Sequence, residues 1–67
     1  MRFDRQLFDL QQARTIFAVI ASDARLCTFE ALARGQYARA CNLVAQVIEA
    51  QNQIARLDER IVSFQRA

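Results

Sequence analysis

Apolar residues in the second half of the chain recur at alternating spacings of three and four. The series begins at Ala40 and continues with Leu43, Val47, Ala50, Ile54, Leu57, Ile61 and Phe64. This spacing places every member on one face of an α-helix and fills the a and d positions of successive heptads. We therefore expect a long helix over about residues 36–65. The seven members from Leu43 to Phe64 are called the seam, and they predict a coiled-coil contact with another helix.

The first half of the chain carries a broader helical pattern. Its stripe consists of Phe3, Leu7, Leu10, Ala13, Phe17, Ile20, Ala24 and Cys27, widened by Phe8, Ile16 and Val19. Spacings of three and four again indicate a helix and not the alternation of a strand, so we expect a helix over about residues 4–33. Ser22 and Asp23 are residue types that begin helices, which leaves an interruption or kink near 22–24 open.

The only glycine, Gly35, stands between the two patterns, and the chain has no proline. A glycine just past a helix end often adopts the left-handed conformation that closes the helix, and Arg34 suits the negative end of the helix dipole. One unbroken helix is the alternative, because the heptad register also continues backward through Ala33 and Phe29. Such a helix would leave the apolar stripe around Phe17 uncovered. The sequence therefore predicts an all-α fold, a helical hairpin of two long helices around Gly35 in one domain.

The supply of apolar side chains exceeds what one hairpin can cover. A second stripe, formed by Tyr37, Cys41, Val44 and Ile48, lies beside the start of the seam, so this part of the helix should be buried on two sides. Two hairpins that dimerise through the seam would cover both stripes in a four-helix bundle or coiled coil. Parallel and antiparallel assembly both fit the pattern, and a foreign protein could take the place of the second copy.

Composition excludes several classes of protein. The chain has 67 residues, of which 54% are hydrophobic, and a net charge of +2. The longest apolar run, Ile16 to Ala21, is far shorter than a membrane span of roughly 20 residues. The charged N-terminus does not resemble a secretory signal, so we expect a cytoplasmic protein with no membrane association.

Catalysis and metal binding are not expected. The chain has no histidine, and its carboxylates, its tyrosine and its two cysteines show no spacing that would pair a nucleophile with a base. Two cysteines without histidine make a zinc site improbable. In a hairpin Cys27 and Cys41 would stand at similar heights, and we expect them to be small buried apolar residues rather than a redox pair. We predict no enzyme, no metal and no cofactor.

Nucleic-acid binding is a weaker alternative. The segment from Thr28 to Leu43 has a partial helix-turn-helix pattern, with Arg39 and Asn42 as candidate base readers. Its second helix would be much longer than a recognition helix, and nine arginines face seven acids without a clustered basic face. A small helix-turn-helix DNA-binding regulator is therefore kept only as an alternative.

Recognition of another protein suits the remaining features best. Arginine and aromatic residues dominate interface hot spots, and the candidate partner-binding residues are Arg14, Arg25, Phe29, Arg34, Tyr37 and Arg39. Twelve alanines and nine arginines without any lysine suggest a GC-rich gene of a bacterium or of its virus.

In size, in Ala- and Arg-rich composition and in its two helical halves around Gly35, the chain resembles the small all-helical bacteriophage proteins that inhibit host regulators, pili or defence components. The anti-quorum-sensing type is one example. This resemblance implies stoichiometric binding of a bacterial host protein, as a homodimer and in the host cytoplasm. The layout is also similar to that of type III secretion co-chaperones, which cover an aggregation-prone subunit with a helical face. Inhibition by occlusion of a surface is the predicted function, and a co-chaperone role is the alternative.

Overall fold

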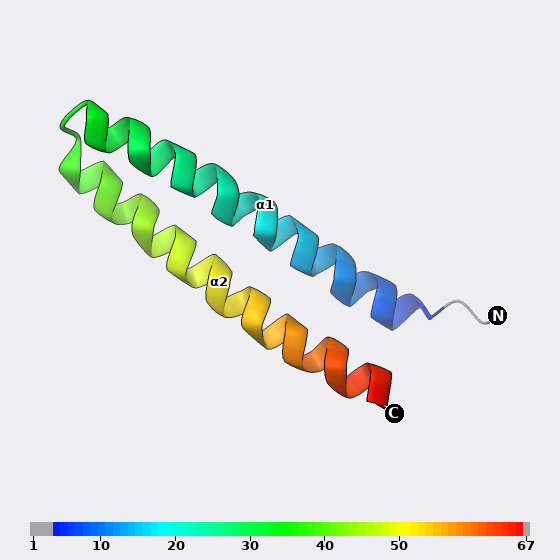
Figure 1. Ribbon diagram of the computed structural model, residues 1–67. Coiled ribbons are helices and arrows are strands. Elements are labelled where there is room, and N and C mark those ends of the chain that lie inside the picture. The colour runs from blue at the N-terminus through cyan, green and yellow to red at the C-terminus, as the bar shows by residue number, and fades with distance from the viewer. Residues whose placement is uncertain (1–3, 67) are drawn as a thin grey trace.

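Two antiparallel helices make up the part of the chain that the structure describes. The computed structural model describes residues 4–66, with α1 at Arg5–Ala33 and α2 at Tyr37–Arg66. The helices lie side by side over their whole length, with the turn at one end and the start of α1 beside the end of α2 at the other (Figure 1). The predicted all-α hairpin around Gly35 is therefore confirmed. Phe3, the first member of the predicted stripe, lies outside the described residues.

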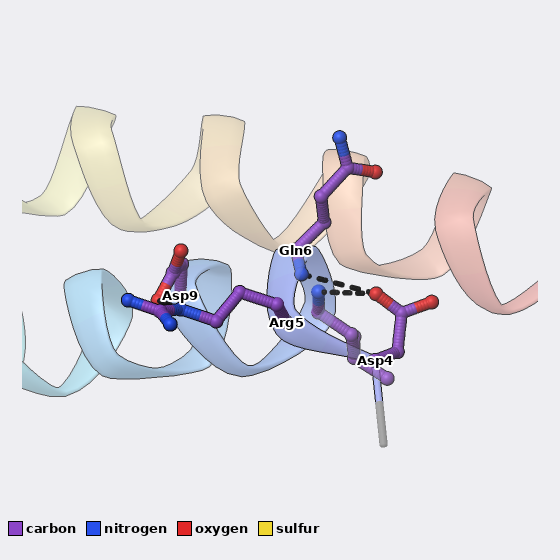
Figure 2. A network of polar contacts seen from close by, with 5 residues as sticks. Asp4, Arg5, Gln6 and Asp9 are labelled. Atoms are coloured by element: carbon purple, nitrogen blue, oxygen red, sulfur yellow. Dashed lines mark hydrogen bonds and ion pairs between the residues drawn. The ribbon is translucent and has the colours of Figure 1, made fainter. Parts of the chain in front are cut away.

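The start of α1 is fixed by a side-chain cap. The Asp4 carboxylate accepts hydrogen bonds from the backbone N–H groups of Gln6 and Leu7, at 3.0 and 3.2 Å (Figure 2). These are two of the donors that a helix N-terminus leaves without an intrahelical partner. Arg5 and Asp9, one turn apart, form an exposed ion pair at 3.7 Å. From this start α1 runs as one α-helix to Ala33, and its α-helical structure is unbroken through Ser22 and Asp23.

Gly35 closes α1 and reverses the chain. Its φ of +72° is in the left-handed region, which glycine enters without the steric cost of a Cβ. The N–H of Gly35 donates to the carbonyl of Leu32 at 3.1 Å, and the N–H of Gln36 donates to the carbonyl of Ala31 at 2.8 Å. These two bonds form a Schellman motif, which satisfies carbonyls that the last helical turn leaves free.

Small residues form the closest contact between the helices. The buried residues are Ala21, Ala24, Ala31, Ala40, Ala50 and Leu57. An antiparallel register set by the turn at Gly35 and by an ion pair between Arg14 and Asp58 brings Ala31 level with Ala40 and Ala21 level with Ala50. Side chains of one methyl group allow two helix backbones to approach closely. The most deeply buried positions of the hairpin are therefore mostly alanines, and the larger seam residues other than Leu57 are only half-buried around them.

The seam of α2 packs within the chain. Ala50 and Leu57 are buried, and the other five seam residues are half-buried beside α1. A dimer through the same seam would require these side chains to leave α1, so dimerisation through the seam stays a prediction. In the hairpin, α1 already covers the seam.

The side of α1 that faces α2 differs from the predicted stripe at three positions. Ala21 is buried, whereas its neighbour Ile20, which the stripe includes, is exposed. Arg14 and Thr28 occupy two further inward positions of the same repeat. The Arg14 side chain pairs with Asp58, and the Thr28 hydroxyl donates to the carbonyl of Ala24 at 2.7 Å. Because the residues at these inward positions are small or polar, the hydrophobicity pattern does not mark them. It follows the larger apolar residues beside them in sequence instead.

Candidate protein-binding surfaces

Most large apolar side chains of the hairpin lie on its outside. The exposed ones among the described residues are Phe8, Ile16, Val19, Ile20, Leu26, Phe29, Leu32, Tyr37, Val44, Ile48 and Val62. The accessible surface of the chain is 5370 Å². A compact folded protein of 7.7 kDa would expose about 4300 Å². The hairpin therefore exposes about 1000 Å² more than a compact domain of its mass.

One apolar surface covers the end of the hairpin near Gly35. It consists of Phe29 and Leu32 from α1 and Tyr37, Cys41, Val44 and Ile48 from α2, and it is called the turn-end face. All six are exposed, and Phe29 and Tyr37 have 70% and 68% of their surface accessible. In the heptad register, these six residues flank the contact between α1 and α2. They all lie on the same side of that contact, because equivalent flanking positions of two antiparallel helices are neighbours.

The second burial of this region is not provided within one chain, and its burial in an assembly stays a prediction. The stripe of Tyr37, Cys41, Val44 and Ile48 is exposed, because α1 covers only the adjacent seam. In the register of the hairpin, Phe29 and Leu32 of α1 lie beside this stripe of α2 and continue the apolar surface. Sequence analysis missed Leu32 in this role, although its position three residues after Phe29 places the two on one side of α1.

A second apolar surface belongs to α1 alone. Ile16, Val19 and Ile20 are exposed near the middle of the helix and follow the spacing i, i+3, i+4, and they are called the α1 ridge. No charged residue occurs from Thr15 to Ser22. Since α1 also exposes Phe29 and Leu32 on another side, it is apolar around most of its circumference. A helix with apolar residues all round is typical of the interior of an assembly.

An open groove near the free ends of the helices has a mixed lining of apolar, charged and amide side chains: Gln6, Asp9, Leu10, Ala13, Leu57, Glu59, Arg60, Ser63 and Phe64. Among the described residues no three His, Cys, Asp or Glu side chains gather as a metal site would require. The groove brings together no group of residues that suggests catalysis.

The predicted partner-binding residues do not form one cluster. Phe29 and Tyr37 lie on the turn-end face, and the register places Arg25 at its edge. Arg34 and Arg39 are exposed near the turn, at register positions on the opposite side. Arg14 is separate from the others, because it faces α2 and pairs with Asp58.

The two cysteines are free and differ in burial. Cys27 is half-buried and Cys41 is exposed, so the expectation that both are buried is wrong for Cys41. They stand at similar heights along the hairpin, but the register places them on opposite sides. Cys41 is exposed because it lies outside the seam, where α1 does not cover it.

None of the helices in the described part of the chain is long and apolar enough to cross a membrane. Comparison with protein-family models, with curated proteins and with solved structures finds no match to this chain. The function therefore has to be argued from the surfaces of the hairpin.

Proposed function

We propose that this hairpin is a protein-binding module that inhibits a bacterial protein by covering one of its apolar surfaces in a one-to-one complex. The observation that carries the proposal is the pattern of burial: in the described part of the chain, five of the six buried residues are alanines, and eleven large apolar side chains are exposed. A fold that served only its own stability would bury the large residues, because each such side chain contributes about 1.5–3 kcal/mol when it is removed from water.

The α1 ridge is the surface that contacts the target. A helix that docks into a hydrophobic groove presents anchors at i, i+3 and i+4, and Ile16, Val19 and Ile20 have this spacing. The absence of charge from Thr15 to Ser22 lets the ridge enter a groove without desolvating an ion. A groove filled in this way is closed to its natural ligand, which accounts for inhibition by occlusion.

Packing of α1 against α2 prepares the ridge for binding. An isolated peptide loses conformational entropy when it becomes helical on a target, and this loss weakens its affinity. Here α1 is already a 29-residue helix, capped by Asp4 and closed by the turn at Gly35. The hairpin therefore presents three apolar anchors on a formed helix.

The test compares two exposed valines. Val19 lies on the α1 ridge and Val62 lies on α2, and both are about half exposed. Tagged wild-type protein, Val19→Asp and Val62→Asp are used for affinity capture from a nuclease-treated bacterial lysate, after circular dichroism has shown that each variant is helical. We expect one protein to be retained near one-to-one by the wild type and by Val62→Asp, and its recovery to fall at least about tenfold with Val19→Asp.

The captured protein is then purified and its own activity is measured with and without the hairpin. Loss of activity with the wild type and with Val62→Asp, but not with Val19→Asp, supports inhibition through the ridge. Equal capture by all three variants would show that the ridge is not the binding surface. Capture of no protein, together with binding of the purified hairpin to duplex DNA that falls steeply as the salt concentration rises, would favour the DNA-binding alternative.

A further inference from the structure

We infer that the turn-end face is the contact between two copies of this chain, which stack through this face into a four-helix dimer. The proposal concerns a different surface from the α1 ridge and does not depend on the identity of any target. It assigns the dimer contact to Phe29, Leu32, Tyr37, Cys41, Val44 and Ile48.

The exposed area of the hairpin fits one added layer of helices. The chain measures 53 × 17 × 10 Å, so it is one helix thick and has two open sides. Stable domains have at least two packed layers around an apolar core. The excess accessible surface of about 1000 Å² is close to the roughly 800 Å² that each partner buries in an interface of standard size. A second copy stacked on the turn-end face supplies both the layer and the missing burial.

The composition of the turn-end face favours a symmetric contact. Its six residues are aromatic, aliphatic or thiol-bearing, and the only charged side chain at its edge is Arg25. In a two-fold contact, residues near the axis meet their own counterparts in the other copy. Phe29 and Cys41 stand at the same height near the centre of the face, so the axis passes close to both. Apolar side chains there contact each other without leaving a buried charge unpaired.

Charge predicts how the dimer responds to salt. The charged residues from 25 to 48 are Arg25, Glu30, Arg34 and Arg39, which together carry a net charge of +2. The whole chain also has a net charge of +2, and Glu49 follows just beyond this range, so the net charge of the chain is located in the turn region. Stacking two such ends places like charges in the same dimer, although Arg34 and Arg39 lie on the side away from the contact and only Arg25 lies at its edge. Added salt screens this repulsion, and the dimer should therefore become tighter, or stay equal, as the salt concentration rises.

The two cysteines provide a matched pair for cross-linking. Cys41 lies on the turn-end face and Cys27 lies on the opposite side of the hairpin. Cys27→Ser and Cys41→Ser are each treated with a short bismaleimide under reducing conditions before quenching and gel analysis. We expect a cross-linked dimer with Cys27→Ser, in which Cys41 meets its counterpart, and at most a trace with Cys41→Ser. Equal cross-linking of both variants, or of neither, would overturn the assigned axis.

Solution mass tests the interface without cysteine chemistry. Sedimentation equilibrium at several concentrations is measured for the wild type, for Phe29→Asp and for the control Val62→Asp. We expect dimers for the wild type and for Val62→Asp, and a dissociation constant raised at least about 30-fold for Phe29→Asp, the effect of losing one hot-spot side chain. A wild type that is monomeric at all concentrations, or a Phe29→Asp variant that keeps the dimer mass, would overturn the proposal. Failure here would leave the Val19→Asp capture result unaffected.

Discussion

Enlarging one buried alanine tests whether the helices meet through small residues. Ala50 is a member of the seam and has only 3% of its surface accessible, and Ala21 of α1 stands level with it at 2%. In a coiled-coil pattern the position of Ala50 is one where leucine is usually favourable. The hairpin makes the opposite prediction, because a leucine at this position would meet α1 where the helices are in closest contact. Ala50→Leu should therefore destabilise the chain.

The magnitude follows from the crowding of that contact. Added methylene groups in a well-packed interior cost about 1–3 kcal/mol, because side chains leave their preferred rotamers or the backbones move apart. For a domain of this size, 1 kcal/mol lowers the melting temperature by about 4–8 °C. We expect a decrease of roughly 4 °C or more for Ala50→Leu.

Ala55→Leu is the matched control, since Ala55 lies on the same helix and is exposed. Substitution there should change the free energy of unfolding by no more than about 0.5 kcal/mol. Both variants are melted while circular dichroism at 222 nm is followed, and urea titrations give the free energies. All samples are measured at one protein concentration, because the proposed dimer would make the melting temperature concentration-dependent. A melting temperature of Ala50→Leu equal to or above that of the wild type would refute the alanine contact.

Further substitutions test the start of α1, the turn and the ion pair by the same urea titrations. Asp4→Ala removes both cap hydrogen bonds and should lower the free energy of unfolding by about 1 kcal/mol, while Asp4→Asn should keep most of it; no difference between the two would contradict the cap. Gly35→Ala meets no atom within 4 Å but must hold φ at +72°, so a loss of about 1–2 kcal/mol is expected, and a gain would exclude the left-handed turn. The Arg14–Asp58 pair is nearly half exposed and should contribute at most about 1 kcal/mol, so the double variant Arg14→Leu with Asp58→Asn should lose no more than about 1 kcal/mol; a larger loss would show that the pair is a main source of stability.

Local rules account for most of the backbone. The two helices follow from the spacing of apolar residues, and the turn follows from the only glycine, whose left-handed conformation other residues rarely adopt. The seam of α2 was also predictable, because the eight-residue series from Ala40 to Phe64 that contains it has no missing position. Each of these features depends on residues within a few turns of one another.

The inward side of α1 was harder to predict from its sequence. The true repeat passes through Arg14, Ala21 and Thr28, where small or polar residues take the place of large apolar ones. Ile20 lies beside Ala21 in sequence and dominates any hydrophobicity pattern, although it is exposed. Only the position of α2 decides which of the two neighbours is covered, because α1 is apolar on several sides.

The sequence by itself determined that this chain forms two helices, where they turn, and which face of α2 packs. The tertiary structure decided that this face packs on α1 of the same chain, that alanines make the closest contact, and that Phe29, Tyr37 and Val44 remain exposed. The physical reason is that periodicity depends on the geometry of one helix, whereas burial depends on where a second helix lies. A small residue can be buried only when another backbone comes close, and a large one becomes exposed when none does.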